Sequence, residues 1–171
     1  HTFGDWKPNY ELPKLNFEYE KPLTSPVYKE VLGRERDMAV LAWRMPRVGN
    51  FQSYDKLEVL AQLLHNGKAG LFDLDLNQSQ QVLASYCYAS GMADYSSLMT
   101  IALPKEGQTL EQVRDLILQE MEKIKKGDFP DSMLKAIVNN MKRSYMQSLE
   151  SSESRASQMV EAFVNGMEWS D

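Results

Sequence analysis

The chain has 171 residues, of which 43% are hydrophobic and 25% are charged, and this ordinary globular composition excludes a disordered protein. Its length favours one domain over two. The formal net charge of −5 gives no positive surface for phosphate groups, which excludes nucleic acid as an expected partner, and no run of about 18 apolar residues is present to form a membrane span.

The first 26 residues predict an extended strap. They contain four of the seven prolines, and proline interrupts both helices and the interior of β-ladders. Because the chain opens at His1 without a methionine, we expect it to be a fragment of a longer parent. We therefore interpret residues 1–26 as the end of a preceding domain and an interdomain strap, and residues 27–171 as a single α+β domain.

Two strands and a helix are predicted at the start of this domain. Residues 27–32 and 38–45 are rich in β-branched and apolar residues and are separated by a charged stretch, which suits two strands joined by a turn. Ser53 can cap a following helix, in which leucine and alanine recur with helical spacing until Asn66-Gly67 ends it.

The middle of the chain predicts a short helix followed by a β-hairpin. Residues 69–80 are interpreted as the helix, although their apolar residues alternate in a way that also suits a strand. Residues 82–89 and 97–103 are strand-like runs on either side of a connection that contains glycine. We expect these two runs to pair antiparallel.

Three helices are predicted in the last third of the chain. Thr109 and Gln112 have the spacing of a capping box, and Gly127 ends the helix that they begin. Pro130 fits the first position of the next helix, and Ser151-Ser152 separate that helix from the last one. The order β-β-α-α-β-β-α-α-α gives an α+β fold class, an antiparallel-leaning mixed sheet with helices packed on one face.

The apolar faces of these elements predict a core between the sheet and the helices. The residues expected to be buried are Trp43, Leu60, Leu64, Val113, Ile117, Ile137 and Met141. The last helix carries an apolar stripe of Ala156, Met159, Val160, Phe163 and Met167.

The sequence lacks the residues that common catalytic and metal sites require. A zincin site needs two histidines one helical turn apart with a glutamate between them, and the only histidines are His1 and His65. A serine or cysteine triad would need one of the same two. Cys87, the only cysteine, has no base nearby in sequence and is expected to be a small buried side chain. We expect no catalytic residue, no metal ligand and no cofactor in this chain.

Asp73, Asp75 and Asn77 resemble an oxygen-rich cation loop at first sight. The leucines between them, and the missing glycine and terminal glutamate, argue against calcium. His65 lies at the end of a predicted helix, where a partial positive charge would suit the helix dipole.

Several runs carry a resemblance to a known family. Leu41-Ala42-Trp43-Arg44-Met45-Pro46, then Asn66-Gly67-Lys68-Ala69-Gly70-Leu71-Phe72-Asp73-Leu74, follow the order of strand, helix, glycine-rich turn and short helix in the insulinase/pitrilysin zinc metallopeptidases. Residues 107–113 agree with the closing helices of that family. The chain resembles the family over residues 27–169, and Phe3-Gly4-Asp5-Trp6 is similar to the end of a preceding family domain.

The resemblance implies a metallohydrolase-like unit that lacks the family's His-x-x-Glu-His motif, and so an inactive domain, the second unit of a half. Such a domain would form part of the peptide-enclosing chamber of a zinc-dependent metalloendopeptidase, with zinc in the parent's catalytic domain. Its partners would be the other domains of the same polypeptide or a catalytic partner subunit, and the peptide substrate. The alternative is an inactive scaffold or binding subunit. The compartment is left open, with a bacterial periplasm or cell envelope as one option.

The resemblance also implies candidates for residues that face the peptide. In the family's last unit an arginine and a tyrosine contact the substrate backbone, but no arginine lies between Arg47 and Arg114, so only a tyrosine can be carried over. The short helix and the next strand border the chamber in the family, which gives the candidates Asn77, Gln78, Tyr86 and Tyr88. The alternative is that the tyrosines, which share one strand face, pack in the core, and that the two amides form a solvated connection.

Overall fold

The structure is a computed structural model that describes residues 4–7, 18, 21–46, 51–91, 95–164 and 168–169, with the backbone alone for residues 51–54. The chain divides into two compact units, His1–Val31 and Leu32–Asp171, and each is described by itself. Much of the predicted strap lies outside the described residues.

The strand predicted at residues 27–32 is absent. The described chain from Lys21 to Met38 forms neither helix nor strand, and Val27 and Leu32 are 65% and 92% exposed. Apolar and β-branched side chains favour a strand only where a neighbour supplies hydrogen bonds and a packing surface, and no described strand pairs with this segment. This strand prediction is therefore wrong, and the described residues contain one strand fewer than predicted.

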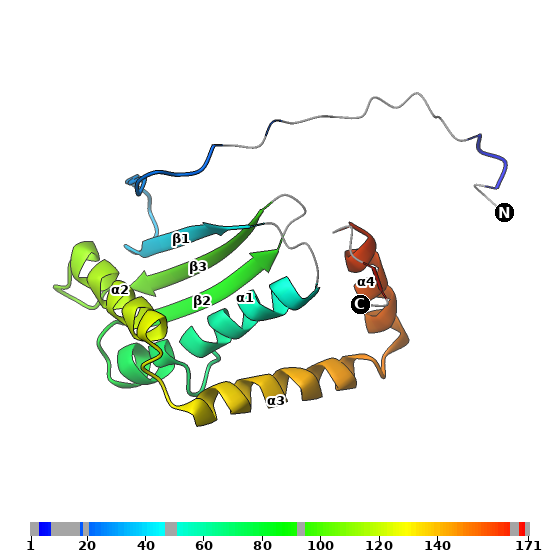
Figure 1. The fold of residues 1–171 in the computed structure, drawn as a ribbon. Coiled ribbons are helices and arrows are strands. Elements are labelled where there is room, and N and C mark those ends of the chain that lie inside the picture. Colours follow the sequence, from blue (N-terminus) through cyan, green and yellow to red (C-terminus); the bar gives the residue numbers. More distant parts are fainter. Residues whose placement is uncertain are drawn as a thin grey trace. The chain divides into compact units, whose positions relative to one another are not determined.

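The second unit is built around a three-stranded antiparallel sheet (Figure 1). Its strands are β1 (Ala39–Met45), β2 (Ala84–Gly91) and β3 (Ser96–Leu103), in the spatial order β1-β3-β2. Leu41 of β1 and Cys87 of β2 both pair with Thr100 of the central strand β3. The predicted hairpin and its antiparallel pairing are confirmed.

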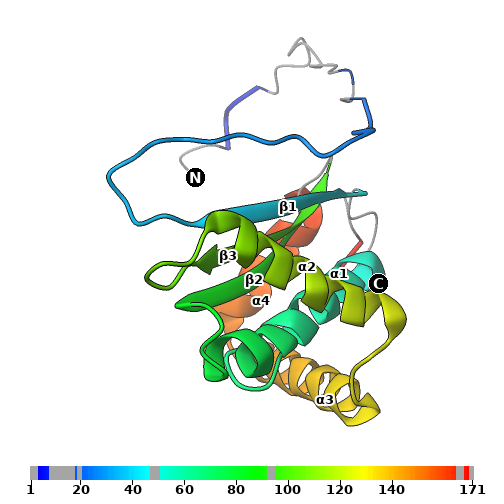
Figure 2. The ribbon, with the colours of Figure 1, turned by 90° about the vertical axis from the view of Figure 1, so that its left-hand side faces the viewer.

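The two faces of this sheet have different surroundings. Leu98, Ala102 and Cys87 are buried in one cluster with residues of the helices α1, η1 and α2, which pack on that face (Figures 1 and 2). On the opposite face, Tyr86 and Tyr88 are 46% and 44% exposed. The described part of this unit therefore covers one face of the sheet and leaves the other open.

Helix α1 (Phe51–Leu64) leads from β1 back to the core face of the sheet. Leu57, Ala61 and Leu64 are buried, as helical spacing requires of one face. Ser53 lies inside the helix and is not its cap, so that prediction is wrong. Serine is tolerated in the first turn as well as at the cap, so its presence alone does not locate the helix start.

The short helix predicted within residues 69–80 is confirmed as η1 (Phe72–Gln78), a π-helix, and the strand alternative is wrong. Leu71 and Phe72 at its start are 5% and 0% exposed, and Leu76 is also buried. This element therefore contributes apolar side chains to the core immediately before β2 begins.

Helix α2 (Leu110–Lys126) begins and ends as predicted. Thr109 and Gln112 form the capping box, and Gly127 ends the helix with a φ of 70°, a left-handed conformation that suits glycine. Val113 and Ile117 are fully buried and hold the helix on the sheet. Here local sequence signals and tertiary packing agree.

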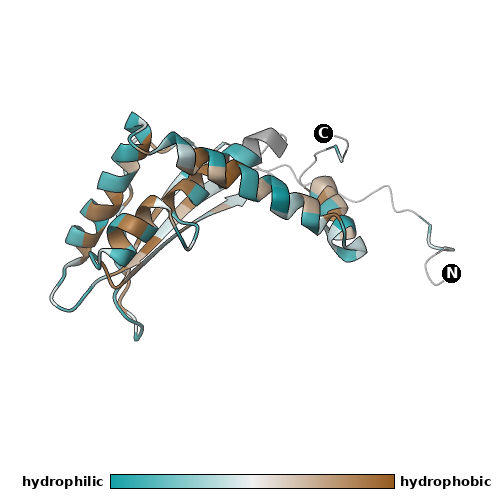
Figure 3. Ribbon diagram, turned by 90° about the horizontal axis from the view of Figure 1, so that it is seen from below, coloured by the Kyte–Doolittle hydropathy of each residue, from teal (hydrophilic) through white to brown (hydrophobic). Residues whose placement is uncertain are grey.

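The last two helices are α3 (Asp131–Ser148) and α4 (Ser152–Val164). Pro130 occupies the N-cap position of α3, one position before the first helical position that was predicted for it. Four residues of the predicted apolar stripe, Ala156, Met159, Val160 and Phe163, are exposed, the last of them at 85%, and the fifth, Met167, lies outside the described residues. Ala162 of α4 is buried, and Figure 3 shows hydrophobic residues along this helix. Of the predicted core residues, four are buried and three are half-buried: Leu64, Val113, Ile117 and Ile137, then Trp43, Leu60 and Met141.

Candidate functional site

The connection between α1 and η1 is organised by one buried carboxylate. Asp73 is 4% exposed, and its Oδ2 accepts hydrogen bonds from the backbone N–H groups of Asn66 (2.9 Å), Lys68 (3.1 Å) and Gly70 (2.9 Å). Its Oδ1 lies 2.7 Å from Nδ1 of His65. Both oxygens of Asp73 therefore have partners within the protein, and the residue acts as an anchor for the turn.

The rest of this turn explains why its residue types are needed. Asn66 accepts hydrogen bonds at Oδ1 from the N–H groups of Lys68 and Ala69, and its Nδ2 donates to the carbonyl of Gln62. A Cβ atom at Gly70 would lie 2.5 Å from the carbonyl oxygen of Leu64, so only glycine fits there. The run that carried the family resemblance is thus a structural link between two helices.

Asn77 holds the first residues of β2. Its Oδ1 accepts hydrogen bonds from the N–H (2.7 Å) and the hydroxyl (2.9 Å) of Ser85, and its Nδ2 donates to the Ser85 carbonyl (3.0 Å). The side chain of Asn77 thereby occupies the position of a neighbouring strand. Gln78, the next candidate, is engaged at Nε2 with the carbonyl of Lys68 (3.0 Å).

The two candidate tyrosines lie side by side on the open face of the sheet. Tyr86 makes an edge-to-face contact with His65, with ring centroids 5.5 Å apart, and the hydroxyl of Tyr88 lies 2.7 Å from the sulfur of Met99. Because both rings are more than 40% exposed, the alternative that they pack in the core is wrong. All four candidates come from η1 and the adjacent strand, as the resemblance implied.

A second charged group was missed by the sequence reasoning. Nζ of Lys123 lies 2.7 Å from Oδ2 of Asp75 and 2.9 Å from Oε1 of Glu120. Burial raises the pKa of Glu120, and Lys123 counteracts part of that rise. Asp75 and Lys123 are far apart in sequence, and no local pattern brings them together. The contact fastens η1 to α2.

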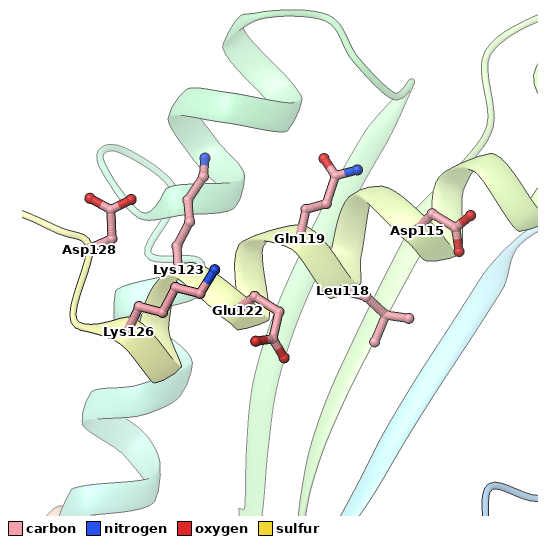
Figure 4. A pocket seen from close by; sticks show the side chains of 7 residues that line it. All are labelled: Asp115, Leu118, Gln119, Glu122, Lys123, Lys126 and Asp128. Atoms are coloured by element: carbon pink, nitrogen blue, oxygen red, sulfur yellow. The ribbon is translucent and has the colours of Figure 1, made fainter.

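Two shallow hollows on the described surface carry no catalytic set of residues. One, of about 580 Å³, lies along α2 and is bordered by charges of both signs, including Glu122, Lys123 and Lys126 (Figure 4). Another, of about 480 Å³, lies between η1 and the connection from α2 to α3. Neither includes a histidine or a cysteine, and neither includes the four candidate residues.

The remaining reactive groups are held in inert positions. Cys87 is buried, and burial, with a smaller contribution from Glu58, raises the pKa of its thiol to about 12, so the thiolate is not formed near neutral pH. Among the described residues, no three histidine, cysteine or acidic side chains are grouped as metal ligands.

Within the described residues, no helix is both long enough and apolar enough to cross a membrane.

Comparison with known proteins decides the family. The family model described as the peptidase M16 inactive domain matches residues 1–141. The chain belongs to this family. It is thus a non-catalytic domain of a peptidase family, which confirms the resemblance to the inactive domain of the insulinase/pitrilysin peptidases.

The chain is similar in structure to a protease from Helicobacter pylori whose crystal structure is known. The two are 23% identical with a TM-score of 0.68, and the match covers 75% of this chain and 31% of the other. This likeness shows the fold, and the chain spans about a third of the length of that neighbour. No curated protein matches the chain.

Proposed function

We propose that this domain forms part of the wall of a peptide-enclosing chamber in a zinc-dependent metalloendopeptidase, and that it cleaves no peptide itself. The observation that supports this most is the open face of the sheet. A solvated face of an antiparallel sheet usually carries polar residues, but here Val40, Tyr86 and Tyr88 are 51%, 46% and 44% exposed. Exposed apolar and aromatic side chains on a continuous surface are typical of contact with a peptide or protein.

The catalytic zinc belongs, in this proposal, to another domain of the same polypeptide or to a catalytic partner subunit. A catalytic zinc needs three protein ligands and an open position for water. The described residues do not fit this requirement, because His65 is their only histidine and its Nδ1 faces Asp73 within the structural turn. What this chain contributes is shape and contact surface.

The peptide-facing surface is proposed to be β2 with its two tyrosines. The Asn77 side chain is bonded to both the N–H and the C=O of Ser85, on the side of β2 that faces away from β3. Residues two positions apart in a strand direct these groups to the same side, so those of Cys87 and Ala89 face the same edge. No described residue outside the sheet forms a backbone hydrogen bond with these two residues. An extended peptide would pair with this edge and contact the tyrosine rings, while Asn77 and Gln78 border it.

A double substitution in the complete peptidase tests this surface. Tyr86→Ala with Tyr88→Ala is expected to lower kcat/KM for an unfolded peptide roughly tenfold, which corresponds to about 1.4 kcal/mol of binding. Zinc content and thermal midpoint should stay unchanged, because both rings are on the surface. Tyr145→Ala, which removes an exposed ring from α3, is the matched control. Equal kcat/KM values in the double variant and the control would contradict a peptide-facing role.

Metal analysis and cleavage assays on this chain and on the complete protein test whether the catalytic zinc lies outside this chain. The chain alone should bind no stoichiometric zinc and cleave no peptide, whereas the complete protein should do both. Zinc or cleavage in the chain alone would refute its inactive role. A complete protein without zinc and without cleavage would favour the alternative, an inactive scaffold or binding subunit.

A further inference from the structure

The ring of Tyr86 lies on a strand that has a neighbour on one side only. In the described sheet β2 is an edge strand, and Tyr86 pairs with Ile101 of β3 on its inner side (Figure 1). Side chains on one face of a sheet are held in place by neighbours on the adjacent strands. On the outer side of β2 no described strand supplies such a neighbour. A side chain from outside the sheet must provide the contact if the ring is to keep one orientation.

His65 provides this contact from the link between α1 and η1. The rings of His65 and Tyr86 meet edge to face, with their centroids 5.5 Å apart and their planes at 83°. This is one of the preferred arrangements of an aromatic pair. His65 directly follows α1, which packs on the opposite face of the sheet, so its ring reaches Tyr86 around the outer edge of β2.

The imidazole of His65 is itself fixed by Asp73. Its Nδ1 lies 2.7 Å from Oδ1 of Asp73, and because a carboxylate oxygen only accepts hydrogen bonds, the hydrogen of this contact is on Nδ1. Asp73 is 4% exposed, and its other oxygen accepts hydrogen bonds from three backbone N–H groups of the link. The orientation of the His65 ring is therefore tied to the backbone of the turn.

Tyr88, two residues further along β2, is held in a different way. Its hydroxyl lies 2.7 Å from the sulfur of Met99, which is its partner in the register with β3. Its contact thus comes from within the sheet, whereas that of Tyr86 comes from the link. The two tyrosines of the open face are oriented by independent contacts, and Tyr88 can serve as an internal control for Tyr86.

We infer that His65 is a positioning residue for the peptide-facing surface, and that its ring holds Tyr86 in the orientation in which Tyr86 meets an extended peptide. A ring that is already oriented loses less conformational freedom when the peptide binds, so the contact favours binding. His65 acts through Tyr86, and Asp73 orients His65. The effect on binding rests on the proposed function, whereas the orientation of the ring does not.

Two substitutions in the complete peptidase separate the ring of His65 from its contact with Asp73. His65→Gln removes the ring and leaves an amide that can still donate to Asp73. It should raise KM for an unfolded peptide about threefold and leave kcat unchanged. His65→Phe keeps an aromatic ring beside Tyr86 and should bring KM back to within about twofold of the original value. An equal rise in both variants, or in neither, would contradict a role of the ring.

A double-mutant cycle tests whether His65 acts through Tyr86. In a Tyr86→Ala background, His65→Gln should change KM no further, because the ring that it positions is already absent. In a Tyr88→Ala background, the same substitution should still raise KM about threefold. A further rise in the Tyr86→Ala background would overturn the inference.

Crystal structures of the complete peptidase and of its His65→Gln variant separate a failure of this inference from a failure of the proposed function. In the variant the ring of Tyr86 should leave its original orientation, while the ring of Tyr88 stays in place. An unmoved Tyr86 ring would overturn the inference. A ring that moves, together with an unchanged KM in Tyr86→Ala, would refute the peptide contact of the proposed function and support the orientation of Tyr86 by His65.

Discussion

The link from His65 to Gln78 and the helix α4 are held to the unit in different ways. The link is fastened by Asp73, which bonds three backbone N–H groups, and by Phe72, which is fully buried. In α4, Met159 and Phe163 are 47% and 85% exposed, and Ala162 is the buried residue. An apolar helical stripe therefore does not guarantee burial, whereas a buried carboxylate with backbone partners fixes a turn that contains few apolar residues.

The largest difference between an anchored position and α4 is expected in side-chain truncation. Ile117→Ala removes a fully buried side chain between α2 and the sheet, and should lower the free energy of unfolding by about 2–5 kcal/mol. Met159→Ala on α4 is the comparison and should change it by about 0.5 kcal/mol or less. Urea denaturation of both variants measures the effect. Similar losses in the two would show that α4 is packed as firmly as α2.

A smaller but more specific loss is expected at the turn itself. Asp73→Asn keeps the shape of the side chain but removes the charge that strengthens its bonds to the N–H groups of Asn66, Lys68 and Gly70. The free energy of unfolding should fall by about 1.5–3 kcal/mol. Asp75→Asn, which affects a half-buried ion pair with Lys123, should cost about 1 kcal/mol or less. Equal losses in the two variants would mean that the hydrogen bonds from the backbone to Asp73 stabilise the protein no more than the ion pair of Asp75 does.

Much of this architecture could be predicted from sequence where local signals and packing coincide. The capping box of Thr109 and Gln112 and the terminal Gly127 located α2, and two strand-like runs around a connection with glycine located the hairpin. The prediction of a strand at residues 27–32 failed because strand propensity alone does not form a strand where no partner strand supplies hydrogen bonds. The exposure of α4 also escaped prediction, because periodicity gives the apolar face of a helix but not the surface, if any, that covers it.

The four candidate residues were assigned from the family resemblance, and their peptide-facing role stays a prediction. The resemblance pointed to η1 and β2, and the structure places Asn77, Gln78, Tyr86 and Tyr88 there. Side-chain bonds decide what Asn77 does, since its amide is paired with Ser85 across eight positions of sequence. The contact of Lys123 with Asp75 spans forty-eight positions and has no local signal. Such contacts follow from the tertiary fold alone.

The smallest expected effect concerns the pH dependence of the fastening between η1 and α2. Burial raises the pKa of Glu120 above its ordinary value of 4.5 in the folded protein. The folded state therefore holds this proton more tightly than the unfolded chain does, so the contribution of Glu120 to stability falls as pH rises from about 4.5 through the folded pKa. Glu120→Gln removes the titration, and its stability relative to the original protein should improve between about pH 4 and about pH 7.

Glu122, two residues further along α2, provides a control of opposite sign. Its hydrogen bond to Lys125 lowers the pKa of this exposed carboxyl, so its contribution is present above the ordinary pKa and is lost as pH falls through the lowered one. Glu122→Gln should therefore lose stability relative to the original protein as pH rises over the same interval. Urea denaturation of the three proteins at several pH values distinguishes the two trends. Parallel trends in both variants would show that burial of Glu120 does not control its proton.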